Sequence, residues 1–102
     1  MIKEPKMKKQ HALEALSQLK PELIKRFGVT RLALFGSTVR DEASEGSDID
    51  IIISFGGVAT SKQYFGAQFL LEDTLGQPID LVTENALRPE LKTIIENEAV
   101  NV

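Results

Sequence analysis

The segment that most constrains the fold is residues 48–54, which read DIDIIIS. Successive side chains of a β-strand point to opposite faces of the sheet. One face of this strand would therefore carry Asp48, Asp50 and Ile52, and the other would carry isoleucines only. Two carboxylates on one strand face repel each other, so solvent or a counter-charge must relieve the pair. The segment predicts a strand with one apolar and one acidic face.

The rest of the chain alternates between helix and strand patterns. Apolar residues at steps of three and four predict a helix that ends at Gly28, and Pro21 predicts a kink or a break into two helices near Leu19. The other predicted elements are a short helix or turn at 38–43, strands at 31–35, 79–83 and 99–102, and helices at 61–75 and 86–97. This order predicts an α/β (α+β) fold, a small sheet covered mainly by helices.

Two sets of apolar side chains are expected in the core. The spacing of aliphatic residues on the last predicted helix turns them inward, and the aromatic residues of the 61–75 helix are better explained by core packing than by ligand stacking. The first set is Leu87, Leu91, Ile94 and Ile95, and the second is Tyr64, Phe65 and Phe69.

Composition narrows the classes of function. The 102 residues are 42% hydrophobic and 26% charged, so residues 1–102 are expected to form one globular domain whose segment 1–27 is helical. The lack of cysteine excludes a thiolate zinc site, and the single histidine, His11, argues against histidine clusters and serine–histidine triads. No stretch approaches the ~18 apolar residues of a membrane span, and no apolar signal core is visible near the start. We therefore expect a cytoplasmic protein without a membrane partner.

Charge is distributed unevenly along the chain. Residues 1–31 carry eight Lys or Arg and three Glu, whereas residues 32–102 carry four basic and twelve acidic side chains. A uniformly basic nucleic-acid-binding protein would not show this division, so direct nucleic-acid binding is not expected. The basic segment is either a solvated helix before an acidic domain or an element that faces phosphates or an acidic partner.

The acidic side chains have the spacing of metal ligands. The Cα atoms of Asp48 and Asp50 would lie about 7 Å apart, two strand rises of ~3.3 Å, so both side chains can converge on one cation or on two cations ~4 Å apart. Oxygen ligands favour Mg²⁺ or Mn²⁺ over zinc. The alternative for this pair is an exposed edge strand with two acids. Asp80, in another apolar run, favours metal binding if its strand is a neighbour, because three ionised acids at short range are unfavourable without metal.

A turn directly after the first predicted strand could bind phosphate. Gly36 lets the backbone approach a phosphate closely, and the following amides and the Ser37 hydroxyl can donate to its oxygens. No Walker lysine follows, which excludes a P-loop. Arg40 is either a phosphate clamp or an ordinary surface arginine.

Together these residues resemble the DNA polymerase β-like nucleotidyltransferase superfamily, in which Gly-Ser is followed by ten residues and then by Asp-x-Asp. Gly36-Ser37 and Asp48-Ile49-Asp50 have that spacing. More narrowly, LALFGSTVRDEASEGSDIDIII, IDLVTENAL and LKTIIENEAV resemble the minimal nucleotidyltransferases (MNT), which are short antitoxin partners of HEPN-domain toxins. The resemblance implies a small mixed β-sheet of the nucleotidyltransferase fold, similar to the palm of polymerase β, flanked by helices.

The resemblance also implies roles for individual residues. Asp48 and Asp50 would ligate two Mg²⁺ ions, and Asp80 would complete the site of the catalytic ion and serve as the base for the attacking hydroxyl. Ser37 and the amides near Gly36 would hold the triphosphate of ATP.

The sequence departs from the family pattern at three places. Arg40-Asp41-Glu42 stands where Arg-Gly-Glu is common, the loop at 44–46 is acidic, and Asn101 stands where an aromatic residue is common. None of these changes removes an expected metal ligand.

The activity implied by the resemblance is transfer of AMP from ATP to a hydroxyl. Because the catalytic core consumes nearly all of the 102 residues, the acceptor is expected on another chain, such as a tyrosine of a partner HEPN toxin. One alternative is an antitoxin that neutralises its toxin by contact alone. Another is the modification of a small antibiotic. Homo-oligomers and hetero-oligomers both remain open.

Overall fold

The computed structural model describes residues 8–43 and 47–102 and contains one mixed four-stranded sheet in the order β3-β2-β1-β4. Strand β1 is antiparallel to β2 and β4, and β2 is parallel to β3. The elements in chain order are α1 (Lys9–Phe27), β1 (Arg31–Phe35), the 3₁₀ turn η1 (Gly36–Thr38), β2 (Ile49–Ser54), α2 (Ser61–Leu75), β3 (Ile79–Thr83), the 3₁₀ turn η2 (Glu84–Ala86), α3 (Pro89–Glu98) and β4 (Val100–Asn101). The predicted fold class is confirmed.

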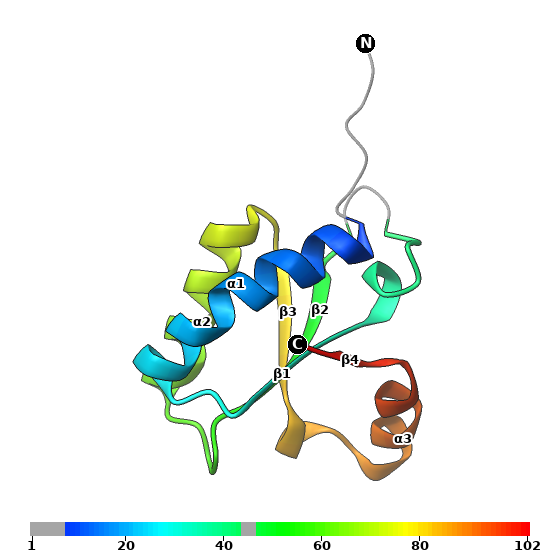
Figure 1. The fold of residues 1–102 in the computed structure, drawn as a ribbon. Coiled ribbons are helices and arrows are strands. Elements are labelled where there is room, and N and C mark those ends of the chain that lie inside the picture. Colours follow the sequence, from blue (N-terminus) through cyan, green and yellow to red (C-terminus); the bar gives the residue numbers. More distant parts are fainter. Residues whose placement is uncertain (1–7, 44–46) are drawn as a thin grey trace.

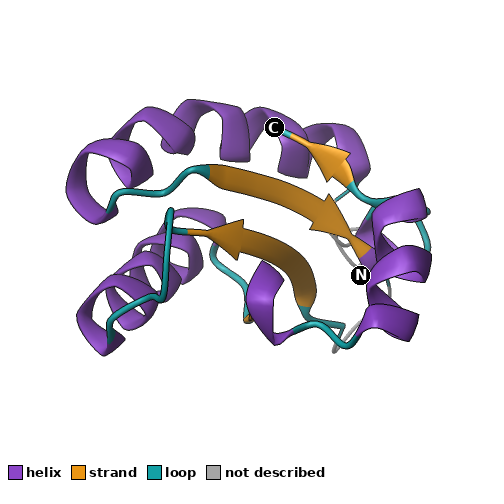
Figure 2. Ribbon diagram, turned by 90° about the horizontal axis from the view of Figure 1, so that it is seen from below, coloured by secondary structure: helices purple, strands orange, loops and turns teal. Residues whose placement is uncertain are grey.

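The core lies between the sheet and two of the helices. Helices α1 and α2 lie side by side, and their buried residues pack in one cluster with Ile49, Ile51 and Ile53 of β2. The predicted alternation along β2 is therefore confirmed. Helix α3 lies on the other side of the molecule from α2, next to β4 (Figures 1 and 2). None of the described helices is long and apolar enough to cross a membrane.

The predicted break at Pro21 is wrong, because α1 runs as one helix from Lys9 to Phe27. A proline inside a helix removes one backbone hydrogen bond and crowds the preceding turn. Here Leu16 and Leu19 before it and Leu23 after it are all buried in the core. The core contacts on both sides of the proline keep the helix continuous through it. The helix ends as expected, with the left-handed residue Gly28 at its C-terminus.

Part of the predicted core is also wrong. The side chains of Leu91 and Ile94 are 50% and 66% exposed, and those of Phe65 and Phe69 are 53% and 70% exposed. Periodicity shows which residues share a helix face, but it does not show whether that face meets the sheet. No residue of α3 is buried. The helix is instead tied to the sheet by polar contacts, which are described below.

The two edge strands of the sheet are β3 and β4. Tyr64 of α2 is half-buried, and its hydroxyl donates to the Leu81 carbonyl of β3 at 2.5 Å. At the opposite edge, β4 is only two residues long and pairs with Ala33 and Leu34 of β1.

Helix α2 begins with a reciprocal capping box. The Thr60 hydroxyl accepts from the Gln63 amide at 3.1 Å, and the Gln63 side chain accepts from the Thr60 amide at 2.9 Å. Loss of such a cap costs about 1 kcal/mol. Thr60→Ala should therefore lower the melting temperature by about 4–8 °C in calorimetry. Ser61→Ala, which removes the next hydroxyl but no cap, should have little effect. An equal loss in both variants would contradict this account.

Candidate active site

The pairing of the central strands brings two of the predicted carboxylates together. In the parallel register of β2 and β3, Asp50 lies opposite Asp80. Both therefore point to the sheet face opposite the isoleucines of the core. Asp48 is exposed and lies one residue before β2 begins. The condition on which a shared carboxylate site depended, that the strand of Asp80 neighbours the strand of Asp50, is met.

The carboxylates at this end of the sheet repel one another. Asp50 is half-buried, and its pKa is raised to about 6, first by burial and then by its hydrogen bond and charge interaction with Asp80. The charges of Asp48 and Glu98 raise this pKa further. In the absence of a cation, Asp50 can relieve the repulsion only by keeping a proton near pH 6. Bound divalent cations would relieve it without that proton, so the donor set fits a hard metal ion.

The carboxylates are not yet arranged as a coordination shell. Among residues 8–43 and 47–102, no three His, Cys, Asp or Glu side chains are gathered closely enough to hold a metal. The pairing of β2 and β3 therefore brings two candidate ligands, Asp50 and Asp80, together. Asp48, which precedes the strand, would have to turn toward them.

The predicted phosphate turn lies directly against this pair. Gly36 follows β1 with a φ of +78°, in the left-handed region, and a Cβ added to it would lie 2.1 Å from Asp50 Oδ2. Only glycine fits such a position, because any side chain would strain the backbone and displace the carboxylate. Ser37 and Thr38 complete the 3₁₀ turn. The structure thus brings Gly36 of the predicted turn against Asp50, and Ser37 is the next residue of that turn.

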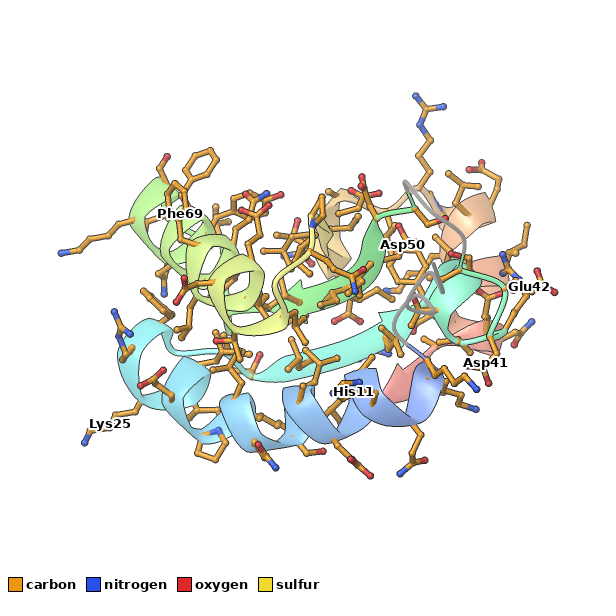
Figure 3. All side chains as sticks on the ribbon, turned by 90° about the horizontal axis from the view of Figure 1, so that it is seen from above. His11, Lys25, Asp41, Glu42, Asp50 and Phe69 are labelled. Atoms are coloured by element: carbon orange, nitrogen blue, oxygen red, sulfur yellow. The ribbon has the colours of Figure 1, made fainter. Side chains whose placement is uncertain are left out.

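Arg40 reaches the same region from the residues after the turn. Its Nε donates to Glu42 at 3.1 Å, and its Nη1 donates to Glu98 at 2.6 Å. Figure 3 shows Asp50 and Glu42 toward one end of the molecule and Phe69 and Lys25 toward the other. Arg40 is neither a free surface arginine nor yet a phosphate ligand, because two carboxylates hold its guanidinium.

Glu98 is the residue of this site that sequence reasoning missed. It is the last residue of α3, and its Oε1 accepts from the Gly36 amide at 2.5 Å. A glutamate in a polar helix gives no signal of such a role. Only the meeting of the end of α3 with the end of β1 reveals it.

The departure at Asp41 has a structural explanation. Asp41 has a φ of +55°, which is the backbone region that favours glycine. Its side chain accepts from the Lys9 amide at 2.8 Å, at the start of α1, where the flanking Lys8 supplies no side-chain cap. The carboxylate therefore satisfies an otherwise open helix amide. The acidic loop at 44–46 lies outside the described residues.

The sequence and the fold are similar to those of known proteins. A family model described as a nucleotidyltransferase domain matches residues 16–102. The protein adenylyltransferase MntA of Thermococcus cleftensis is 37% identical over 87 residues, which cover 85% of this chain and 88% of that protein. The structure of a candidate minimal nucleotidyltransferase superposes with a TM-score of 0.79 at 31% identity, over 97% of this chain and all of that chain. A chain of the complex between tri-AMPylated Shewanella oneidensis HEPN toxin and MNT antitoxin shares the fold, with a TM-score of 0.65 at 18% identity, over 91% of this chain and 70% of that chain.

Proposed function

Because the chain belongs to the nucleotidyltransferase-domain family, we propose that it is an antitoxin that transfers AMP from ATP to a hydroxyl of its partner toxin. The observation that carries the proposal is the placement of Asp50 opposite Asp80, with the Gly36 turn packed against Asp50. This arrangement puts candidate metal ligands and candidate phosphate donors side by side. The similarity to MntA supports a protein as the acceptor.

Each site residue has a task in this reaction. Asp48, Asp50 and Asp80 would hold divalent cations, most simply two Mg²⁺ ions, with Mn²⁺ as the alternative. Such ions, when bound, lower the pKa of an attacking hydroxyl and neutralise charge on the phosphates. The Gly36–Ser37 turn and Arg40 would hold the triphosphate, through the amides that follow Gly36, the Ser37 hydroxyl and the guanidinium. Asp80 is exposed on the site face and can accept the proton of the attacking hydroxyl.

The proposed acceptor is a tyrosine of a HEPN toxin. The structurally similar MNT–HEPN complex, whose toxin is AMPylated, supports a HEPN toxin as the acceptor protein. AMP adds bulk and negative charge to the residue that carries it, which can block an RNase site. The reaction balances simply. The hydroxyl oxygen forms a bond to the α-phosphorus, the bond from that phosphorus to the bridging oxygen breaks, and pyrophosphate leaves.

Intact-mass spectrometry of a partner HEPN toxin, incubated with this protein, ATP and Mg²⁺, tests the proposal. AMP-sized mass steps are expected with the unchanged protein. They should fall by at least ~10³-fold when Asp48, Asp50 and Asp80 are all replaced by asparagine. The matched control replaces three exposed carboxylates away from the site, with Glu22→Gln, Asp73→Asn and Glu90→Gln. Unchanged toxin mass, together with toxin inhibition by the triple-asparagine variant, would instead identify an antitoxin that acts by contact.

A further inference from the structure

The end of helix α3 contacts two parts of the site that lie on a different segment of the chain. The Oε1 atom of Glu98 accepts from the Gly36 amide at 2.5 Å, and its Oε2 accepts from Arg40 Nη1 at 2.6 Å. One carboxylate thus joins the Gly36–Ser37 turn to the arginine that follows it. Both bonds carry charge on at least one partner, which makes them stronger than neutral hydrogen bonds.

The position of Glu98 is fixed by polar contacts on both sides of it. Two residues earlier on α3, Glu96 forms a two-pronged pair with Arg31 of β1, at 2.8 and 2.6 Å. Immediately after α3, Val100 of β4 pairs with Leu34 of β1. Glu98 is therefore held between two attachments of its own segment to β1. The end of α3 that carries Glu98 is therefore attached to the sheet rather than free.

These contacts set the direction of groups that a triphosphate would use. The bond to Glu98 fixes the peptide that enters the Gly36–Ser37 turn, and so the direction of the amides that follow it. Arg40 is held at Nε by Glu42 and at Nη1 by Glu98. A guanidinium has five N–H donors, so these bonds leave donors for a further anion. A side chain oriented in advance loses less entropy when it binds its ligand.

We propose that Glu98 is a positioning residue of the nucleotide site, which orients the Gly36–Ser37 turn and Arg40 to receive the triphosphate. The inference rests on the proposed function and deepens it, because it makes α3 part of the nucleotide site. A carboxylate that competed with the triphosphate for the same donors would have the opposite effect. The two effects move nucleotide affinity in opposite directions.

Calorimetric titration with Mg–ATP and with Mg–tripolyphosphate tests the proposal. Tripolyphosphate lacks the nucleoside of ATP, so it tests the phosphate contacts alone. Glu98→Ala should raise the Kd of both ligands by about tenfold, the scale expected for losing charge-assisted hydrogen bonds. Glu98→Gln should lose less, because its amide oxygen can still accept from the Gly36 amide. Melting temperatures measured alongside report any loss of fold.

Glu96→Ala is the matched control, because it removes the same kind of carboxylate–arginine pair from the same helix. It should lower the melting temperature at least as much as Glu98→Ala, and weaken both ligands less. Equal weakening of both ligands by the two variants, with an equal loss of melting temperature, would show that affinity depends on the attachment of α3 rather than on the contacts of Glu98 with the turn and Arg40, and would overturn the inference. Tighter binding by Glu98→Ala would show competition and would also overturn it. If the unchanged protein binds neither ligand, the proposed function itself fails.

Discussion

Replacing Asp50 by asparagine is expected to stabilise the metal-free protein while abolishing AMP transfer. The pKa of Asp50 is raised to about 6, mainly by burial and by Asp80, so its ionised form destabilises the folded state. A shift from 3.8 to about 6 corresponds to at most ~3 kcal/mol, and solvent screening at this half-buried site reduces that to about 1 kcal/mol. The melting temperature should therefore rise by about 4 °C or more.

The pH dependence follows from the sign of this shift. A carboxyl whose pKa is higher in the folded than in the unfolded state is protonated first in the folded state, so the chain pays no penalty below the unfolded value of 3.8. The penalty grows as the pH rises from about 4 to about 6 and is complete above that range. The difference in melting temperature between Asp50→Asn and the unchanged protein should grow over the same range.

Thermal unfolding in EDTA at several pH values measures this difference. Asp73→Asn, an exposed carboxylate on α2, serves as the control and should leave the melting temperature nearly unchanged. Added Mg²⁺ or Mn²⁺ should stabilise the unchanged protein more than Asp50→Asn, because binding to the folded state raises its stability. A lower melting temperature for Asp50→Asn in EDTA at pH 7.5 would contradict the repulsion described here.

Replacing Gly36 by alanine is expected to damage both stability and activity. A left-handed backbone costs a non-glycine residue about 1–2 kcal/mol. The new Cβ would also lie 2.1 Å from Asp50 Oδ2, so the turn or the carboxylate must move. We expect a loss of more than about 2 kcal/mol in the free energy of unfolding, and a fall of at least ~10²-fold in AMP transfer.

Two other glycines serve as controls that separate the cost of a left-handed backbone from the cost of the close contact with Asp50. Gly76 has a φ of +69° with nothing within 4 Å of an added Cβ, and Gly57 also has open space there but no left-handed φ. Gly76→Ala should show the backbone cost alone, and Gly57→Ala should show neither effect. Denaturant unfolding and toxin mass measurements would rank the three variants. If Gly36→Ala were no worse than Gly76→Ala, the close approach to Asp50 would be refuted.

Patterns local to one strand or one turn were sufficient to predict much of this site. The alternation at 48–54 assigns each side chain to a face, and the same rule applied to Asp80 predicts a shared face once the two strands pair. The Gly-Ser turn was recognisable by its spacing to the Asp-x-Asp pair, which carries the resemblance to the nucleotidyltransferases. Such features need no knowledge of the rest of the chain.

What the sequence could not predict depends on contacts between distant segments. Glu98 acquires its role because α3 ends where β1 ends, and no periodicity encodes that meeting. Leu91 and Phe69 are exposed because the helix faces that carry them do not pack against the sheet. The continuity of α1 through Pro21 depends on the core on either side of it. Each of these is a packing outcome rather than a local preference.

The two edges of the sheet also limit how this protein can join a partner. An exposed strand edge invites another chain to add a strand through backbone hydrogen bonds. Here β4 offers only two residues, and a carbonyl of β3 is already bonded to the Tyr64 hydroxyl. We therefore expect association through side-chain surfaces, so that a partner can dock and leave without extending the sheet.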